Sequence, residues 1–213
     1  MGVAAASAAA VALPLSTQAR EPLRAEFITV AVMQSRARTL GDMAAELDAV
    51  VVSGARKDLI CVPVPVDPAN STLAALAGQA ARYGVTLAVR AGGADLLLTP
   101  AGEIKTGQPV YRTDIGNIAF ADPWTNAVPH PDVEIVVQLS EGPISFERAR
   151  QFAAAHDRFV IAATPVGDSF VQASGSAVFG PGGQVLAAAG QAWTQTVAAA
   201  LPLGHYRAGF ALT

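Results

Sequence analysis

Three apolar runs separated by two segments of helical periodicity limit the fold of this 213-residue chain more than any other feature of its sequence. The runs cover residues 27–34, 58–64 and 85–92 and are rich in β-branched residues, as buried strands are. Residues 39–55 and 70–84 lie between them and repeat apolar side chains at helical spacing. Strands that alternate with helices in this way predict a layered α/β fold.

The rest of the chain adds hairpins to this alternation. Residues 95–107 and 174–190 each contain two apolar runs around a turn, at Pro100 to Gly102 and at Gly180 to Gly183. Between the hairpins we expect three strands and one helix, the strands at 116–121, 133–139 and 158–164 and the helix at 144–157. The sequence therefore predicts an α/β layered fold with a mixed sheet, in one domain (26–203) followed by a C-terminal tail (204–213) without a clear pattern.

Composition excludes several classes of protein. The net charge is −3 and no segment carries a basic stripe, so we expect no nucleic-acid partner. The single cysteine, Cys61, excludes an intramolecular disulfide and a cysteine-based metal cluster. Only two lysines are present, Lys57 and Lys105, so any chemistry that needs a lysine must use one of them.

The N-terminal segment, residues 1–25, has the composition of an export signal. Its first nineteen residues, "MGVAAASAAAVALPLSTQA", carry no charged side chain, and Thr17 and Ala19 stand where a signal peptidase prefers small residues. The mild, alanine-rich apolar run is similar to that of twin-arginine signals, and Met1 would then lie inside a longer signal. We expect a periplasmic or secreted protein. A disordered leader of a cytoplasmic protein and a membrane anchor are the alternatives, although the run is short for a stable membrane span.

The order of motifs along the chain carries the most specific information. The motifs are "ITVAVMQ", "GDMAAELDAVVVSGARKDLICVPV", "LAGQAARYGVTLAV", "PAGEI", "IGNIAFAD", "RQFAAAHDRFVIAATPVG" and "SGSAVFGPGGQVLA". In this order they resemble the nitrilase (carbon–nitrogen hydrolase) superfamily over nearly the whole of residues 26–203. The resemblance implies an αββα sandwich, here in a shortened form.

The resemblance also implies where catalytic residues should stand. The superfamily uses a cysteine nucleophile, a glutamate base and a lysine that supports the tetrahedral intermediate, as covalent acyl transfer requires. The glutamate position falls on Val64, directly after Pro63, and the cysteine position falls on Phe120, two residues before Asp122. Apolar side chains therefore replace both the base and the nucleophile.

The lysine position is either displaced or missing. The segment between the superfamily's lysine and cysteine is longer than "EIKTGQPVYRTDIG" permits. If Tyr111 and Arg112 match the Tyr-Arg that precedes the lysine, Thr113 occupies its position, and Lys105 is the nearest lysine.

These replacements predict a protein that is catalytically inactive, uses no cofactor or metal, and acts by binding. The superfamily's dimer interface would then serve a homodimer, or a hetero-oligomer with an active homologue or another periplasmic enzyme. A remnant pocket could bind a small amide, acid or amine, and we expect it to be lined by Pro63, Val64, Lys105, Phe120, Asp122 and Trp124.

Two other interpretations stay open. The chain could hydrolyse amides or nitriles with relocated residues, for which the nearby candidates are Lys105, Asp122, Asp67 and Cys61. A shifted correspondence with Cys61 as nucleophile belongs to this case, although a cysteine in an apolar strand is ordinarily structural. The chain could also be a small-molecule binding protein, with Phe120 narrowing its pocket.

The remaining polar motifs favour structural roles. His130 and Asp132 could bind a metal or form a catalytic pair, but two ligands between prolines favour a surface loop. His156 and Asp157 end a predicted helix, where a cationic His suits the helix dipole. The sequence "GPGGQ" lacks a following helix and predicts a hairpin turn rather than a phosphate loop. We expect Arg148 and Arg150 on a solvated helix face rather than in an anion site, and Trp124 in a pocket or an interface.

Overall fold

The computed structural model describes residues 26–35, 40–54, 56–66, 70–127, 130–140, 144–165, 175–190, 195–204 and 207. The predicted export segment, Thr39, Asp67 and Ser174 lie outside the described residues. Within the described part, no helix is long and apolar enough to cross a membrane.

The strands form two six-stranded sheets. The first sheet has the order β12-β1-β2-β3-β4-β5. Its strands are β1 (Ile28–Gln34), β2 (Leu59–Val66), β3 (Thr86–Ala91), β4 (Ala94–Leu98), β5 (Ile104–Thr106) and β12 (Gln195–Leu201). The second sheet has the order β11-β10-β9-β8-β7-β6. Its strands are β6 (Tyr111–Thr113), β7 (Gly116–Phe120), β8 (Ile135–Leu139), β9 (Phe159–Ala163), β10 (Ala177–Phe179) and β11 (Val185–Ala188).

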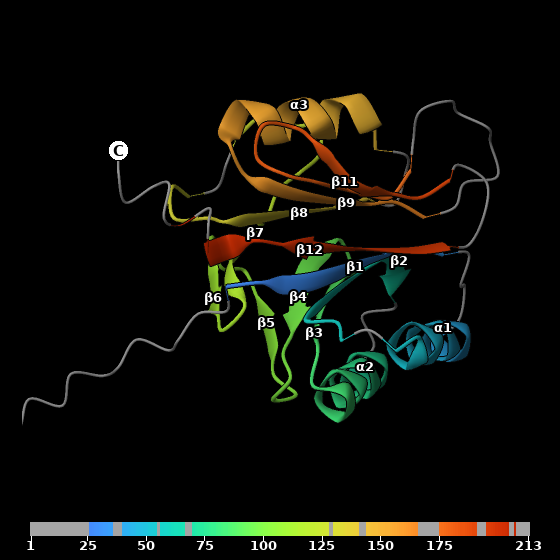
Figure 1. The fold of residues 1–213 in the computed structure, drawn as a ribbon. Coiled ribbons are helices and arrows are strands. Elements are labelled where there is room, and N and C mark those ends of the chain that lie inside the picture. Colours follow the sequence, from blue (N-terminus) through green and yellow to red (C-terminus); the bar gives the residue numbers. More distant parts are fainter. Residues whose placement is uncertain are drawn as a thin grey trace, which may run out of the picture.

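Helices cover the outer faces of the two sheets. Helices α1 (Leu40–Val52) and α2 (Asn70–Tyr83) lie against the first sheet, and α3 (Phe146–His156) lies against the second (Figure 1). The layers therefore run helix, sheet, sheet, helix. This confirms the predicted layered α/β fold of the αββα type, and it resolves the single mixed sheet that the sequence predicts into two.

Both sheets combine a parallel centre with antiparallel edges. Strands β1, β2 and β3 are parallel, as are β7, β8 and β9. Their side chains alternate between two cores. In β1, Val30 and Val32 face the core between the sheets, whereas Ala31 and Met33 face the core under α1 and α2. Burial on both faces explains why these strands are continuous apolar runs in the sequence.

Turn residues end the elements where the sequence predicts. Gly84 follows α2 with a φ of +65°, and Gly102 lies in the β4–β5 turn with a φ of +78°. The "GPGGQ" segment joins the antiparallel pair β10 and β11, with Gly182 at φ +84° and Gly183 at φ +80°. The prediction of a hairpin turn there is confirmed. These positive φ angles cost glycine little and other residues more.

Two strands were not predicted from the sequence. Strand β6 has only three residues, and β12 is the alanine-rich "QTVAAAL", whose composition is poor in the residues that strands favour. Strand β12 pairs with β1 along its whole length, from Ile28 opposite Leu201 to Gln34 opposite Gln195. The chain therefore returns from the second sheet to the first in the last strand that the structure describes.

Candidate functional site

The parallel strands of the two sheets end at the same edge of the sandwich, which we call the carboxyl edge. Arg90 of β3 donates from Nη1 to the backbone oxygen of Leu139 in β8 over 2.8 Å. The backbone N–H of Ser176, just before β10, donates to Oε1 of Gln34 at the end of β1 over 2.9 Å. Ligand sites of parallel α/β sheets lie at such edges, and the resemblance places the catalytic residues of the superfamily there. The opposite edge is called the amino edge below.

The predicted nucleophile position is filled by an aromatic ring. Phe120 is the last residue of β7 and packs against the core between the two sheets. Its ring stands edge-on to the ring of buried Tyr111, with centroids 5.6 Å apart. Asp122 follows, and its carboxylate accepts a hydrogen bond from the backbone N–H of Trp124 at 2.8 Å. The side chain at this position therefore contributes packing and no nucleophile.

The predicted base position lies in a β-bulge of β2. Pairing with β3 shifts between Val62, opposite Val89, and Pro65, opposite Arg90. Pro63 and Val64 are the two residues within this shift, and Pro63 is buried. The side chain of Val64 lies outside the described part of the structure. Bulges are frequent beside active sites because they redirect side chains. The bulge of β2 lies at the position where the resemblance expects a glutamate.

Lys105 and Thr113 lie in a different place from the other predicted site residues. Both line a hollow of about 520 Å³ at the amino edge, together with Arg56 and Asp58. Lys105 is on β5, three strands from β2, which corresponds to about 14 Å. Thr113 pairs with Gly116 at the start of β7, about 13 Å along the strand from Phe120. The structure does not bring these two residues to the carboxyl edge.

Lys105 and Thr113 also form polar contacts with neighbouring residues. Its Nζ lies 3.4 Å from Oε2 of Glu103. Thr113 donates from Oγ1 to the backbone oxygen of Gly116 over 2.7 Å. The ammonium group of Lys105 and the hydroxyl group of Thr113 therefore each have a partner within the hairpin that carries them.

A buried ionic pair at the carboxyl edge was missed by the sequence reasoning. Arg90 Nε lies 3.4 Å from Oδ1 of Asp95, and both side chains are about three-quarters buried, at 24% and 21% exposure. Burial raises the pKa of Asp95, Arg90 opposes this shift, and the nearby charge of Asp122 adds to it. A single arginine within the apolar strand "TLAVRA" was the signal that could have revealed this pair.

A network of neutral groups closes the other side of the carboxyl edge. Buried Ser176 accepts from the N–H of Thr164 and donates to its carbonyl oxygen, each over 3.1 Å. Gln34 donates from Nε2 to the carbonyl oxygen of Gly190 over 2.6 Å, in addition to accepting from Ser176. The glutamine that ends the first strand, which the resemblance singled out, therefore joins the first sheet to the second.

Cys61 does not have the environment of a nucleophile. The thiol belongs to the core between the sheets and has no exposed surface. Burial raises the pKa of Cys61, so the thiol stays protonated at neutral pH. A nucleophilic cysteine needs the opposite, a lowered pKa and access to substrate.

The surface next to Phe120 exposes an aromatic side chain. Trp124 is 57% exposed, and the guanidinium of Arg148 lies over its ring at 5.6 Å from the centroid. Arg148 also donates to the backbone oxygen of Trp124. Arg150 pairs instead with Glu147 on the same helix, at 2.7 Å, and hydrogen bonds from Arg150 and Gln151 lower the pKa of Glu147 to about 2.

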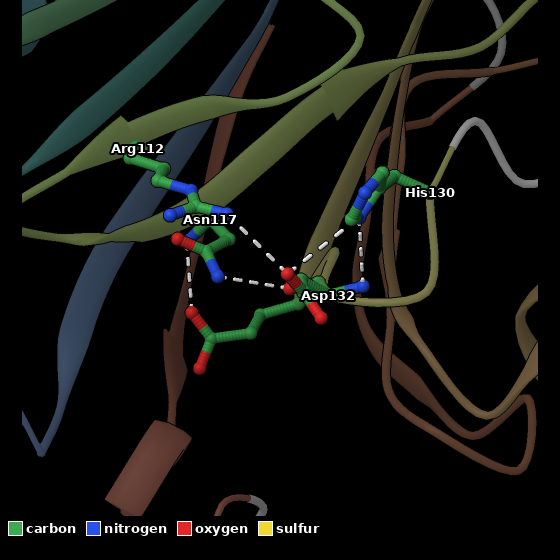
Figure 2. A network of polar contacts seen from close by, with 5 residues as sticks. Arg112, Asn117, His130 and Asp132 are labelled. Atoms are coloured by element: carbon green, nitrogen blue, oxygen red, sulfur yellow. Dashed lines mark hydrogen bonds and ion pairs between the residues drawn. The ribbon is translucent and has the colours of Figure 1, made fainter.

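The side chains of His130 and His156 both contact other side chains of the protein. At the amino edge, Arg112, Asn117 and His130 converge on Asp132 (Figure 2). The Asp132 Oδ2 lies 3.5 Å from Arg112 Nη2 and 3.7 Å from His130 Nδ1. The ring of His156 packs 4.5 Å from the ring of Phe152 at the end of α3. Among the described residues, no group of three or more His, Cys, Asp or Glu side chains could hold a metal ion.

Comparisons with known proteins give a structural match without a sequence match. No protein-family model matches the chain, and no curated sequence matches it significantly. The structure is similar to Nit3 of Saccharomyces cerevisiae, a member of branch 10 of the nitrilase superfamily, with a TM-score of 0.69 and 13% identity over 91% of this chain and 97% of that chain. It is also similar to a carbon–nitrogen hydrolase from Helicobacter pylori G27 (TM-score 0.69, 14% identity, 88% and 93% covered).

A third similar structure is that of an enzyme with a ligand. It is a cysteine-to-alanine variant of the amidase from Nesterenkonia sp. AN1 in complex with butyramide (TM-score 0.64, 17% identity, 85% and 93% covered). The chain therefore has the fold of the nitrilase superfamily. This is the fold that the order of sequence motifs resembles, and the resemblance is confirmed at that level.

Proposed function

We propose that this chain is a catalytically inactive protein of nitrilase fold that acts by binding, as a subunit of a homodimer or hetero-oligomer. The proposal rests on the packing of Phe120 against the core between the sheets, at the position that the resemblance assigns to the nucleophile. A phenyl ring can neither attack a carbonyl carbon nor leave room there for an acyl intermediate.

The positions that the resemblance assigns to the base and the lysine do not supply these groups either. The base position is Val64, and Lys105 lies at the amino edge with Glu103. The one thiol, Cys61, is enclosed in the core with a raised pKa. Catalytic groups act as a unit, so the loss of one removes most of the contribution of the others.

The proposed binding surface is the face that bears Trp124 and Arg148. Superfamily members associate through faces next to their active sites, so a chain without chemistry can retain the interface. Exposed tryptophan and arginine are also the residues most enriched at the energetic centres of interfaces. The partner would be a second copy, an active homologue or another periplasmic enzyme, because we also propose that residues 1–25 direct export to the periplasm or beyond.

An activity assay tests the first half of the proposal. The purified chain is incubated with amides, including butyramide, and with nitriles, and ammonia release is measured. We expect no turnover above buffer for the wild-type chain and the same result for Cys61→Ala. Turnover that Cys61→Ala or Asp122→Asn abolishes would instead assign a hydrolase with relocated residues.

A binding measurement tests the second half. The chain is mixed with candidate partners from its own export compartment, and complexes are measured by light scattering after size-exclusion chromatography. We expect Trp124→Ala to weaken the complex by at least tenfold, in line with the loss of an interface anchor. Val52→Ala, at a residue that is 78% exposed on α1, is the control and should leave the complex unchanged. Equal binding by both variants would contradict the proposed surface.

A second candidate function is small-molecule binding. The hollow of about 520 Å³ that includes Lys105 and Thr113 favours it, because its volume lies within the range of ligand pockets. A thermal-shift screen with amides, acids and amines tests it. A ligand of this hollow should raise Tm in the wild-type chain and not in Lys105→Ala.

A further inference from the structure

The outer edge of β12 is built unlike the other sheet edges of this molecule. Strand β12 has seven residues, all uncharged, and it pairs with β1 in unbroken register. It is the last strand of its sheet, and no described strand pairs with its other side. Edge strands of soluble proteins are normally protected by charge, proline, a bulge or short length, since an open edge is a template for another strand.

The other three edges carry such protection. Strand β5 has three residues and includes Lys105, and β6 has three residues and includes Arg112. Strand β11 has four residues and a register shift against β10 between Val178 and Phe179. Only β12, among the four edge strands of the described sheets, lacks charge, proline, irregular register and short length together.

We infer that the β12 edge pairs with the β12 edge of a second copy of this chain, antiparallel and across a two-fold axis. Alternate residues of an edge strand present backbone N–H and C=O groups outward, and a two-fold axis brings donors of one copy to acceptors of the other. Because β12 is uncharged, two identical strands meet without like charges facing each other. The pairing would join the first sheets of both copies into one continuous sheet.

The side chains of β12 and β11 leave room for a second copy of the chain at this edge. On one face of β12, Val197, Ala199 and Leu201 pack into the core between the sheets. On the other face, Thr196, Ala198 and Ala200 are exposed and small, so they leave the edge accessible. Strand β11, the edge strand of the second sheet, exposes Val185 (48%) and Leu186 (36%). These add apolar area that a second copy would cover (Figure 1 shows β11 and β12 as the neighbouring end strands of the two sheets).

This inference does not rest on the proposed function, because an active and an inactive chain would present the same edge. It names a surface separate from the face of Trp124, so each surface can be altered without the other. Ala198 is the middle residue of β12, so a two-fold axis centred on the strand places Ala198 of one copy opposite Ala198 of the other.

Charge substitution at Ala198 tests the pairing. To exclude association through the face of Trp124, sedimentation velocity is measured on the full chain carrying Trp124→Ala. This chain should be a dimer, and adding Ala198→Lys or Ala198→Glu should give a monomer, since like charges then face each other. An equimolar mixture of the two variants should restore the dimer. Ile104→Lys, on the opposite edge at β5, is the matched control and should remain a dimer.

Several results would overturn the pairing. They are a monomeric wild type at all concentrations, a dimeric Ala198→Lys in the Trp124→Ala chain, or a mixture of the two charge variants that stays monomeric. Loss of the dimer in Trp124→Ala with retention in Ala198→Lys would assign association to the other surface. If the charge variants fail to fold, hydrogen exchange on the wild type decides. The outward amides of β12 should then be protected at high protein concentration and exchange freely after dilution, and equal exchange at both concentrations counts against the inference.

Discussion

The carboxyl edge and the amino edge of the sandwich are held together by different forces. At the carboxyl edge, where the resemblance places the catalytic positions, most contacts are apolar or neutral: Phe120 packs against the core, and Gln34 bonds to Ser176. The one charged group that joins the two sheets there is Arg90, which donates to the carbonyl oxygen of Leu139. At the amino edge, the contacts are charged and include Glu134 with Arg207 and Arg112 with Asp132. The carboxyl edge therefore combines packing and neutral bonds with the Arg90–Asp95 pair, whereas the amino edge depends mainly on ion pairs.

The amino-edge network fixes the end of the described chain. Glu134 lies before β8 with only 8% of its side chain exposed, accepts from the N–H of Asn117 over 2.8 Å, and pairs with Arg207. Gly116 has a φ of +134°, and a Cβ there would lie 3.1 Å from Oε2 of Glu134. Leu203, four residues before Arg207, is buried in the core between the sheets. The Glu134–Arg207 pair therefore attaches the C-terminal segment to the start of β8.

The largest effect should come from breaking that network. Glu134→Ala leaves Arg207 partly buried without its carboxylate and removes the acceptor of the Asn117 N–H. Removing one partner of a buried pair costs about 4 kcal/mol of unfolding free energy, which denaturant titration measures. The control is Glu103→Ala, which removes a 61% exposed carboxylate paired with Lys105 and should cost less than about 1 kcal/mol. Similar losses in the two variants would remove the distinction between a buried network and surface charge.

Phe120 comes next, because it closes the carboxyl edge by packing. Phe120→Ala removes the edge-on contact with Tyr111 and leaves a cavity between the sheets, at a cost of about 3 kcal/mol in unfolding free energy. Phe27→Ala is the matched control at a 58% exposed ring and should cost about 1 kcal/mol or less. If Phe120→Ala were as mild as its control, the edge would be open and the remnant-pocket interpretation would gain support.

Loss of the neutral hydrogen bonds of Ser176 at the carboxyl edge should lower the unfolding free energy by less than either of these changes. Ser176→Ala leaves the buried N–H of Thr164 without its acceptor, which costs about 2 kcal/mol. The control is Ser53→Ala, at an exposed hydroxyl that donates to the backbone oxygen of Val50. It should change the unfolding free energy by about 0.5 kcal/mol or less. A larger loss in Ser53→Ala than in Ser176→Ala would show that these hydrogen bonds do not hold the carboxyl edge.

The fold was predictable from the sequence because the apolar runs, the helical periodicity and the turn glycines all indicate the same layered arrangement. The buried parallel strands are continuous apolar runs, and Gly84 and Gly102 mark ends where the backbone needs a positive φ. Strand β12 escaped prediction because alanine carries almost no strand preference, and its pairing with β1 joins residues far apart in the sequence. A strand that is specified by its partner rather than by its own residues leaves little trace in the sequence.

The site was predictable only in part, for a related reason. Phe120, Asp122 and Trp124 are neighbours in the sequence and stay together at the carboxyl edge. Lys105 is near these residues in the sequence, but it lies on β5 at the far side of the first sheet and lines the hollow at the amino edge. Arg90 and Asp95 also lie at the carboxyl edge. They pair because a two-residue turn between β3 and β4 places them opposite each other, and no sequence motif marks them.

The smallest expected effect concerns the charge that remains at the carboxyl edge. Burial raises the pKa of Asp95, and the charge of Asp122 adds to the shift despite Arg90. The folded state therefore holds a proton to higher pH than the unfolded chain does, so the contribution of Asp95 to stability decreases as pH rises through this range. Asp95→Asn removes that dependence. The unfolding free energy of Asp95→Asn relative to wild type should thus increase from pH 4 toward neutrality, by less than the change expected for Ser176→Ala. Urea titrations across this pH range measure it, with exposed Asp114→Asn as the control. A difference that shrinks as pH rises would mean that pairing with Arg90 outweighs burial, and the carboxyl edge would then depend on charge as the amino edge does.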